Sequence, residues 1–124
     1  MKNPKFRIWL PKSKILTDDP GSFYVTADGD VLDINNDLPF DEEPVLMQYT
    51  GLCDRTGREI WEGDILGNTL GGVIGRVFHS TMYAQYVVAG LGFSEPLSEY
   101  RISEIEVLGN KYENPSLLER LGAD

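Results

Sequence analysis

The chain has 124 residues, of which 41% are hydrophobic and 25% charged, enough for one domain with a modest core and too apolar for wholesale disorder. The longest apolar run, 87–91, is far shorter than the roughly 18–20 residues of a membrane span, and the N-terminus lacks the apolar region of a signal peptide. A single cysteine excludes an internal disulfide, so we expect a soluble, cytoplasmic protein with no membrane contact.

The net charge of −9 disfavours nucleic-acid binding, because affinity for a polyphosphate comes largely from Lys and Arg. The charge is also uneven. Residues 1–14 carry five bases and no acid, whereas residues 15–53 carry nine acids and no base. We interpret the stretch of about 18–44 as a solvated acidic hairpin and loop or, alternatively, as a surface for a basic partner or a mimic of nucleic-acid charge. The candidate contacts in it are Asp41, Glu42 and Glu43.

The first part of the chain shows strand patterns. Apolar residues alternate over 6–10 before Pro11 ends the run. Two β-prone runs, 23–26 and 31–34, then flank an Asp-Gly pair at 28–29. Asp-Gly between such runs predicts a hairpin with a type I′ turn, in which both central residues have positive φ.

The middle of the chain continues in the same manner. A strand is predicted over 45–50, ended by Gly51, and Asp54–Gly57 has the Asp and Gly positions of a type I turn. A further strand over 58–62 is interrupted by Gly63-Asp64, which indicates a bulge or sharp bend of the kind that curves a sheet.

Strands over 73–78, 83–88 and about 101–108 complete the pattern, and short strands with glycine-marked bends favour a small barrel or strongly curved sheet. Only the tail is typical of a helix, with Asn114 as cap and Pro115 in the first turn. The predicted helix has about two turns, and we expect its apolar stripe to dock on the sheet or to mediate self-association. That stripe consists of Leu117, Leu118 and Leu121.

No residue pattern points to catalysis. His79 is the only histidine and adjoins Ser80 and Thr81, but neighbouring strand residues face opposite ways, so a surface or turn histidine is the favoured interpretation. Cys53 has no second cysteine and is interpreted as a structural thiol.

The motifs for metal binding and phosphate binding are also incomplete. Asp28, Asp30 and Asp33 resemble a calcium loop only in part, because Pro39 stands where the bidentate Glu belongs. The glycines at 67–75 lack the Gly-Lys-Ser/Thr sequence and the helix of a phosphate loop. We therefore predict no enzyme, no metal and no cofactor.

Aromatic side chains are abundant enough to line a ligand groove, although core packing is the commoner role of aromatics in short strands. The relevant residues are Trp9, Tyr49, Trp61, Phe78, Tyr83 and Tyr86. Trp61 alternates with Ile60 and Glu62 and is the best candidate for an outward-facing role, although a position in the core or in a subunit interface is the favoured interpretation. Trp61, Glu62 and Asp64 therefore form a second candidate interaction surface, with a fold-defining bend as the favoured alternative.

Three segments resemble the YopX family. Residues 48–65 are similar to its signature, with a Gln-Tyr-Thr-Gly-Leu strand, an Asp-x-x-Gly turn and a Glu-Ile-aromatic-Glu-Gly-Asp run. Residues 106–115 resemble its closing Glu-Val-Ile-Gly-Asn-x-Tyr-Glu-Asn-Pro, and residues 5–9 resemble its Lys-Phe-Arg-Ala-Trp start. Cys53 and Arg55 occupy positions that are often Lys in the family.

The resemblance implies a phage or prophage protein with a β-rich fold related to SH3-type barrels and a tendency to form homo-oligomers. It carries no catalytic residue, because the family's biochemical function is not established. We therefore expect a single YopX-like domain over 1–124, acting as a non-catalytic, homo-oligomeric protein-binding module in the bacterial host cytoplasm. The alternatives are an acidic regulator of a basic or nucleic-acid-binding partner, a nucleic-acid-binding small barrel using 2–14, and an enzyme built on His79.

Overall fold

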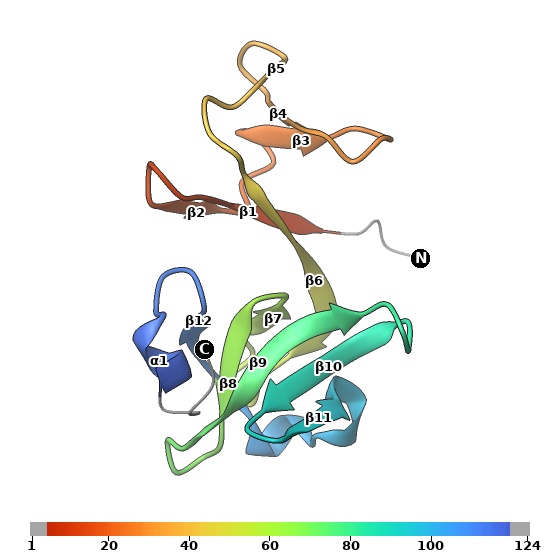
Figure 1. Ribbon diagram of the computed structural model, residues 1–124, viewed down its shortest axis with the longest axis vertical. Coiled ribbons are helices and arrows are strands. Elements are labelled where there is room, and N and C mark those ends of the chain that lie inside the picture. The colour runs from red at the N-terminus through yellow and green to blue at the C-terminus, as the bar shows by residue number, and fades with distance from the viewer. Residues whose placement is uncertain (1–4, 120–124) are drawn as a thin grey trace. The chain divides into compact units, whose positions relative to one another are not determined.

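The computed structural model describes residues 5–119 and is mainly β, with a curled half-barrel sheet and a short C-terminal helix (Figure 1). This confirms the predicted fold class. The chain divides between Gln48 and Tyr49 into two compact units, called here unit 1 (to Gln48) and unit 2 (from Tyr49). The division falls inside strand β6 (Val45–Cys53), and the single domain over 1–124 stays a prediction. No helix among residues 5–119 is long and apolar enough to cross a membrane.

Unit 1 consists of short antiparallel strands. β1 pairs with β2 on one side and with the first half of β6 on the other, while β4 pairs with β3 and β5. Its core is formed by Ile8, Leu10 and Phe23, against which Val31 and Phe40 pack. The strands are β1 (Phe6–Leu10), β2 (Ile15–Thr17), β3 (Phe23–Val25), β4 (Val31–Asp33) and β5 (Leu38–Pro39).

The hairpin between β3 and β4 is confirmed, but the predicted type I′ turn is wrong. Gly29 has a φ of 89°, whereas Asp28 has no positive φ. The Gly29 N–H donates to the Thr26 carbonyl at 2.9 Å, and the Thr26 N–H donates to the Asp30 carbonyl at 2.9 Å. These hydrogen bonds and the single left-handed glycine are typical of a three-residue hairpin loop. Such a loop matches the twist of the strands with one positive φ, where a two-residue type I′ loop needs two.

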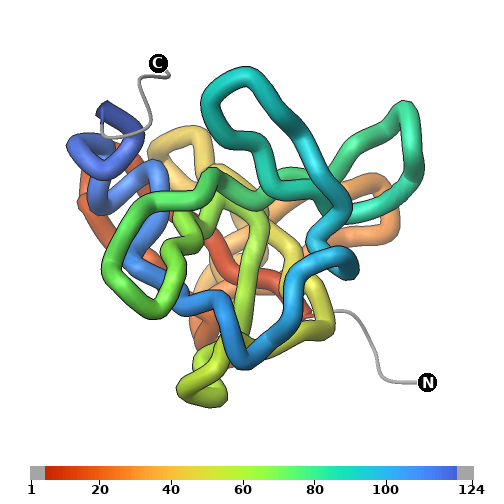
Figure 2. Tube along the Cα trace, turned by 90° about the horizontal axis from the view of Figure 1, so that it is seen from below, coloured from red at the N-terminus to blue at the C-terminus, as the bar shows by residue number. Residues whose placement is uncertain are grey.

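Unit 2 is built on a five-stranded antiparallel sheet in the order β11-β10-β9-β8-β12, which curls into the half-barrel (Figure 1). Val77 of β9 pairs with Val88 of β10, and both point into a core that also holds Ile60, Leu66 and Ile105. The elements are β7 (Glu59–Trp61), β8 (Asp64–Gly67), β9 (Val73–Ser80), β10 (Gln85–Gly90), β11 (Phe93–Pro96), the 3₁₀ helices Leu97–Glu99 and Ile102–Glu104, and β12 (Glu106–Asn110). Separate loops join β8 to β9, β9 to β10 and β10 to β11 (Figure 2).

Glycines and bulges allow the sheet to curl. A Cβ atom on Gly75 would lie 2.5 Å from the Ala89 carbonyl oxygen, so β9 and β10 approach each other more closely than any side chain permits. The β8–β12 ladder shifts register between Val107 and Gly109. The predicted bend before β8 is also present, because Gly63 has a φ of 86°.

The prediction that Gly51 ends a strand is wrong. β6 continues to Cys53, and its pairing with β7 shifts register between Tyr49 and Cys53. Gly51 supplies the positive φ of 90° that the bulge requires. The Thr50 hydroxyl donates to the Ile60 carbonyl at 2.7 Å and accepts from the Leu52 N–H at 3.2 Å, so a side chain replaces ladder hydrogen bonds.

The C-terminal helix α1 (Ser116–Glu119) lies at the predicted place, and the described part of it forms one turn. Leu117 packs near Gly109, because a Cβ atom added to Gly109 would lie 3.1 Å from the Leu117 Cδ1. The Asn114 side chain does not cap this helix. Its Oδ1 accepts the Asn110 N–H at 3.2 Å, while its carbonyl accepts the Leu117 N–H. Asn110 thus competes successfully for the oxygen that the cap prediction assigned to the helix.

Candidate binding pocket

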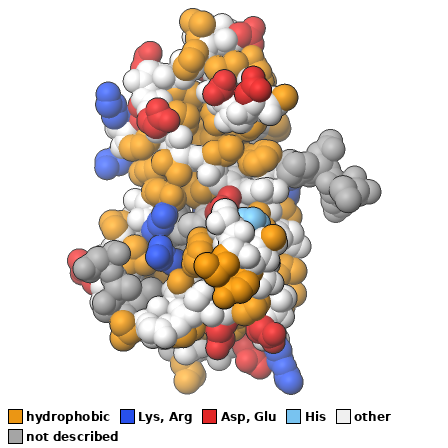
Figure 3. All heavy atoms as spheres, turned by 45° about the vertical axis from the view of Figure 1, so that its right-hand side comes forward, with side chains coloured by type: hydrophobic (Ala, Val, Ile, Leu, Met, Phe, Trp, Pro, Cys, Tyr) orange, Lys and Arg blue, Asp and Glu red, His pale blue; other side chains and the backbone are white. Residues whose placement is uncertain are grey.

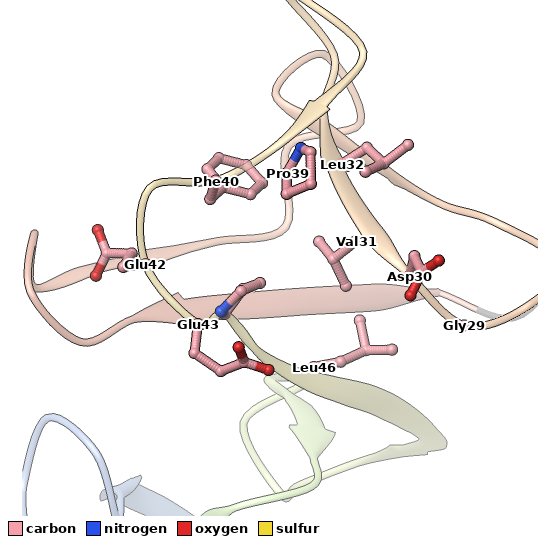
Figure 4. A pocket seen from close by; sticks show the side chains of 10 residues that line it. Gly29, Asp30, Val31, Leu32, Pro39, Phe40, Glu42, Glu43 and Leu46 are labelled. Atoms are coloured by element: carbon pink, nitrogen blue, oxygen red, sulfur yellow. The ribbon is translucent and has the colours of Figure 1, made fainter.

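A pocket of about 380 Å³ opens in unit 1 between β4, β5 and the start of β6 (Figure 4). Strand pairing brings its walls together, because Leu32 of β4 is opposite Pro39 of β5. Two prolines flank the loop that crosses it, and proline restricts backbone torsion there. The lining residues are Gly29, Asp30, Val31, Leu32, Pro39, Phe40, Glu42, Glu43, Pro44 and Leu46.

The floor of this pocket is apolar. Figure 4 shows Val31 between Leu46 below and Pro39 with Phe40 above. Val31, Phe40 and Leu46 are half-buried and pack against the unit 1 core, so that the floor is supported from behind. The pocket therefore combines an apolar floor with a polar rim.

Glu42 is committed to holding the loop. Its carboxylate accepts hydrogen bonds from the Lys12 N–H, the Ser13 N–H and the Ser13 hydroxyl, all in the turn between β1 and β2. The hydroxyl hydrogen bond, with the two backbone donors and the Lys12 charge, holds the Glu42 pKa below its usual value. The predicted contact residue Glu42 therefore has a local role that the sequence did not reveal.

Asp30 and Glu43 carry the charge of the rim. Both side chains are exposed, and neither carboxylate has a hydrogen-bond or ion-pair partner in the described part of the chain. The hairpin fixes the position of Asp30, because its N–H donates to the Thr26 hydroxyl and its carbonyl accepts the Thr26 N–H. Asp41 is also exposed, and acidic side chains lie next to apolar ones at the top of Figure 3.

The second candidate surface lies largely inside the protein. Trp61 is 5% exposed and Asp64 1% exposed, so Trp61 lies in the core, which agrees with the position favoured from the sequence over an outward-facing one. Trp61 packs against the Tyr49 ring with centroids 5.6 Å apart, and the Asp64 Oδ2 accepts the Trp61 N–H at 2.8 Å. Glu62 is half-buried. The pKa of Tyr86 is raised first by the burial of Tyr86 itself and then by the negative charge of Glu62. This segment shapes a bend.

The residues weighed for chemistry are dispersed. His79 is exposed and makes an edge-to-face contact with Tyr86, with ring centroids 5.0 Å apart. The Cys53 thiol lies 3.7 Å from the Tyr49 hydroxyl, and this hydrogen bond, with burial and nearby charge, raises the Tyr49 pKa to about 12. Residues 5–119 contain no group of three His, Cys, Asp or Glu placed to hold a metal ion.

Leu117 and Leu118, the described members of the self-association stripe, are half-buried, and Leu121 lies outside the described residues. Contacts within the same chain therefore already bury part of the surface of Leu117 and Leu118. Whether it mediates self-association stays a prediction.

Sequence reasoning missed the two polar anchors of unit 2. Asp54 is 2% exposed, and its Oδ2 accepts the Val107 N–H at 2.8 Å across 53 positions. Asn110 is also buried, and its Oδ1 accepts the Tyr112 N–H at 3.0 Å and the Glu113 N–H at 2.8 Å. The Asp-x-x-Gly pattern predicted the turn at Asp54, but nothing local indicated the partner on β12.

The comparisons with known proteins agree with the motifs that contain these anchors. The family model described as YopX protein matches residues 5–119. The chain belongs to the YopX family. Asp54 stands in the segment 48–65 and Asn110 in the segment 106–115, so both stretches that carried the resemblance contain a buried polar side chain that binds backbone groups.

A solved structure supports the same fold. The crystal structure of protein EF1440 from Enterococcus faecalis is similar to this YopX family chain, with a TM-score of 0.60 and 28% sequence identity. The similarity covers 95% of this chain and 99% of that chain. None of the curated proteins matches.

Proposed function

We propose that this YopX family chain is a phage- or prophage-encoded accessory protein that binds a basic protein in the bacterial host cytoplasm, without catalysis. The observation that carries the proposal is the acidic surface of unit 1, where Asp30, Asp41 and Glu43 are exposed and residues 15–53 contain no base. Charge complementarity steers partners of opposite sign and suppresses wrong ones, and it therefore favours a basic partner over a nucleic acid.

The family motifs support a role in folding more than one in catalysis. Asp54 and Asn110 direct their side-chain oxygens at backbone N–H groups, which accounts for both residues without any reaction. A buried carboxylate or amide saturated in this way has its hydrogen-bonding capacity used within the fold.

Affinity purification from induced or infected cells tests the proposal. The charge-reversed variant Asp41→Lys with Glu43→Lys should lose the basic partner that the wild type retains, because like charges oppose each other at the contact. Glu42 is left unchanged, since it holds the turn at Ser13. The matched control Asp18→Lys with Glu99→Lys makes the same change in net charge at other exposed positions and should retain the partner. Retention by both variants would contradict the proposal.

Self-association is a second candidate, favoured by apolar side chains at the loops of unit 2. Leu70 is 93% exposed, Met82 81% and Leu91 68%. They lie on three different loops of unit 2, and contact between copies would remove this apolar area from water.

Light scattering across a concentration series checks this candidate. We expect a mass above that of one chain that falls toward it on dilution, and a lower mass for Met82→Ser with Leu91→Ser, because apolar contact area is lost. Glu99→Gln, an exposed change that removes no apolar area, should behave as the wild type. A mass of one chain at every concentration would contradict self-association.

A further inference from the structure

We infer that the unit 1 pocket binds an arginine-containing segment of the partner protein, with apolar residues adjoining the arginine. The inference rests on the proposed function and names the chemistry of its partner. It uses three observations from unit 1: the apolar floor of an open pocket, the two carboxylates without partners, and the deficit of bases along the surrounding chain.

The shape of the pocket favours side chains of a peptide. Its volume of about 380 Å³ is near the lower end of the range for ligand sites, which suits a few side chains rather than a large cofactor. The floor is made by Val31, Phe40 and Leu46, which offer contact to aliphatic carbon. Partner residues next to the arginine would bury their apolar surface there.

The rim selects the charge of the occupant. Figure 4 shows Asp30 at one end of the floor and Glu43 along its lower edge, so that a side chain on the floor lies near a carboxylate. Glu42 is already occupied by Lys12 and Ser13, which leaves Asp30 and Glu43 to bind a cation. Between residues 15 and 53 no Lys or Arg is present, and the charge of Lys12, in the turn between β1 and β2, acts on Glu42.

Arginine fits both features better than lysine. Its aliphatic stem covers apolar surface while its charged head stays at the rim, and the planar guanidinium can donate two hydrogen bonds to one carboxylate. A lysine ammonium is a compact, strongly hydrated charge and gains less from the same geometry.

Fluorescence anisotropy with the full-length chain tests the inference. The probe is a fluorescein-labelled peptide of alternating arginine and leucine, measured at low salt of about 20 mM, where screening is weak. Two control peptides replace arginine by citrulline, which keeps the shape and removes the charge, or leucine by glycine, which removes the apolar contacts. We expect the citrulline peptide to bind at least about tenfold more weakly and the glycine peptide several-fold more weakly.

The protein variants separate the pocket from the overall charge. Asp30→Asn with Glu43→Gln should weaken binding of the arginine peptide at least about tenfold. Asp18→Asn with Glu99→Gln, which removes two exposed acids outside the pocket, should bind within about twofold of the wild type. All four side chains are exposed, so both variants should fold. Equal losses in the two variants, equal binding of the citrulline peptide, or no binding by the wild type would each overturn the inference.

Cell purification distinguishes this inference from the proposed function. If wild type and Asp30→Asn with Glu43→Gln retain the same basic partner equally, the proposed function stands and the pocket inference is wrong. If the peptide binds through the pocket but no partner co-purifies, the ligand chemistry stands and the proposed function is wrong.

Discussion

Replacement of Asp54 by alanine should lower the free energy of unfolding of unit 2 by about 3 kcal/mol, because it leaves buried donors without acceptors. The carboxylate accepts the Thr56 N–H at 2.8 Å, the Thr56 hydroxyl at 2.7 Å and the Arg58 N–H at 3.0 Å, in addition to the Val107 N–H. One side chain therefore closes the β6–β7 turn and attaches it to β12.

Denaturant unfolding followed by fluorescence measures this loss, since Trp61 is the tryptophan of unit 2. Asp41→Ala removes an exposed carboxylate and should change the free energy of unfolding by less than about 0.5 kcal/mol. Asp54→Asn should fall between the two, because it keeps one acceptor oxygen. A change as small for Asp54→Ala as for Asp41→Ala would show that the turn and β12 do not depend on this carboxylate.

The Asp54 contribution should also depend on pH. Burial by itself raises the Asp54 pKa, but hydrogen bonds from Val107, Thr56 and Arg58 outweigh burial and hold the pKa below its usual value. The folded pKa is thus lower than the unfolded one, so the stabilisation is complete above the unfolded pKa of about 4 and is lost as pH falls through the folded pKa. The stability difference between wild type and Asp54→Asn should be constant from about pH 6 to 8 and shrink below about pH 4. A difference that grows in acid would contradict the assignment.

Gly75→Ala should have a comparable effect, with a loss of about 3 kcal/mol, because the new methyl group has no space. Its Cβ atom would lie 2.5 Å from the Ala89 carbonyl oxygen, 2.7 Å from the Ala89 carbonyl carbon and 2.9 Å from the Val88 Cγ1. The two nearest atoms belong to the backbone of β10, so relief requires the central ladder of the sheet to open. Denaturant unfolding measures the loss.

Gly92→Ala is the matched control for Gly75→Ala. Gly92 has a φ of 76° in the β10–β11 turn and no atom within 4 Å of an added Cβ, so its substitution costs backbone strain of about 1–2 kcal/mol without a collision. The larger loss for Gly75→Ala reports the close approach of two strands. If the control loses as much stability, the curl of the sheet does not rest on the Gly75 contact.

Local patterns predicted a large part of the fold. Alternation predicted β1, and the β-branched runs predicted β9 and most of β10. The Asp54–Gly57 turn is confirmed by the Gly57 N–H donating to the Asp54 carbonyl at 3.0 Å. These features depend on interactions between residues a few positions apart, which is the range over which residue type determines backbone conformation. β2, β5 and β11 were missed because they are short and exist through their pairing partners.

The candidate sites were less predictable for the same reason. Asp41 to Glu43 were identified by charge alone, yet the structure gives Glu42 a hydrogen-bonding role and places Asp30, which the sequence singled out only through a partial calcium-loop pattern, on the rim with Glu43. Alternation with Glu62 left the side that Trp61 faces undecided, because a strand residue faces outward only if its sheet has an open face at that point. The exposure of a side chain depends on which other elements cover that face of the sheet, and a local pattern does not contain this information.

The fold class, the YopX motifs, the acidic segment and the Asp54–Gly57 turn followed from the sequence, because each is encoded by neighbouring residues or by composition. That Asp54 reaches Val107, and that Asp30 and Glu43 share a pocket, became evident only from the folded chain. Both outcomes depend on strand register, since a shift of one residue turns every side chain to the opposite face. Register is set by the whole set of pairings and bulges in each unit, and no short segment of the chain contains that information.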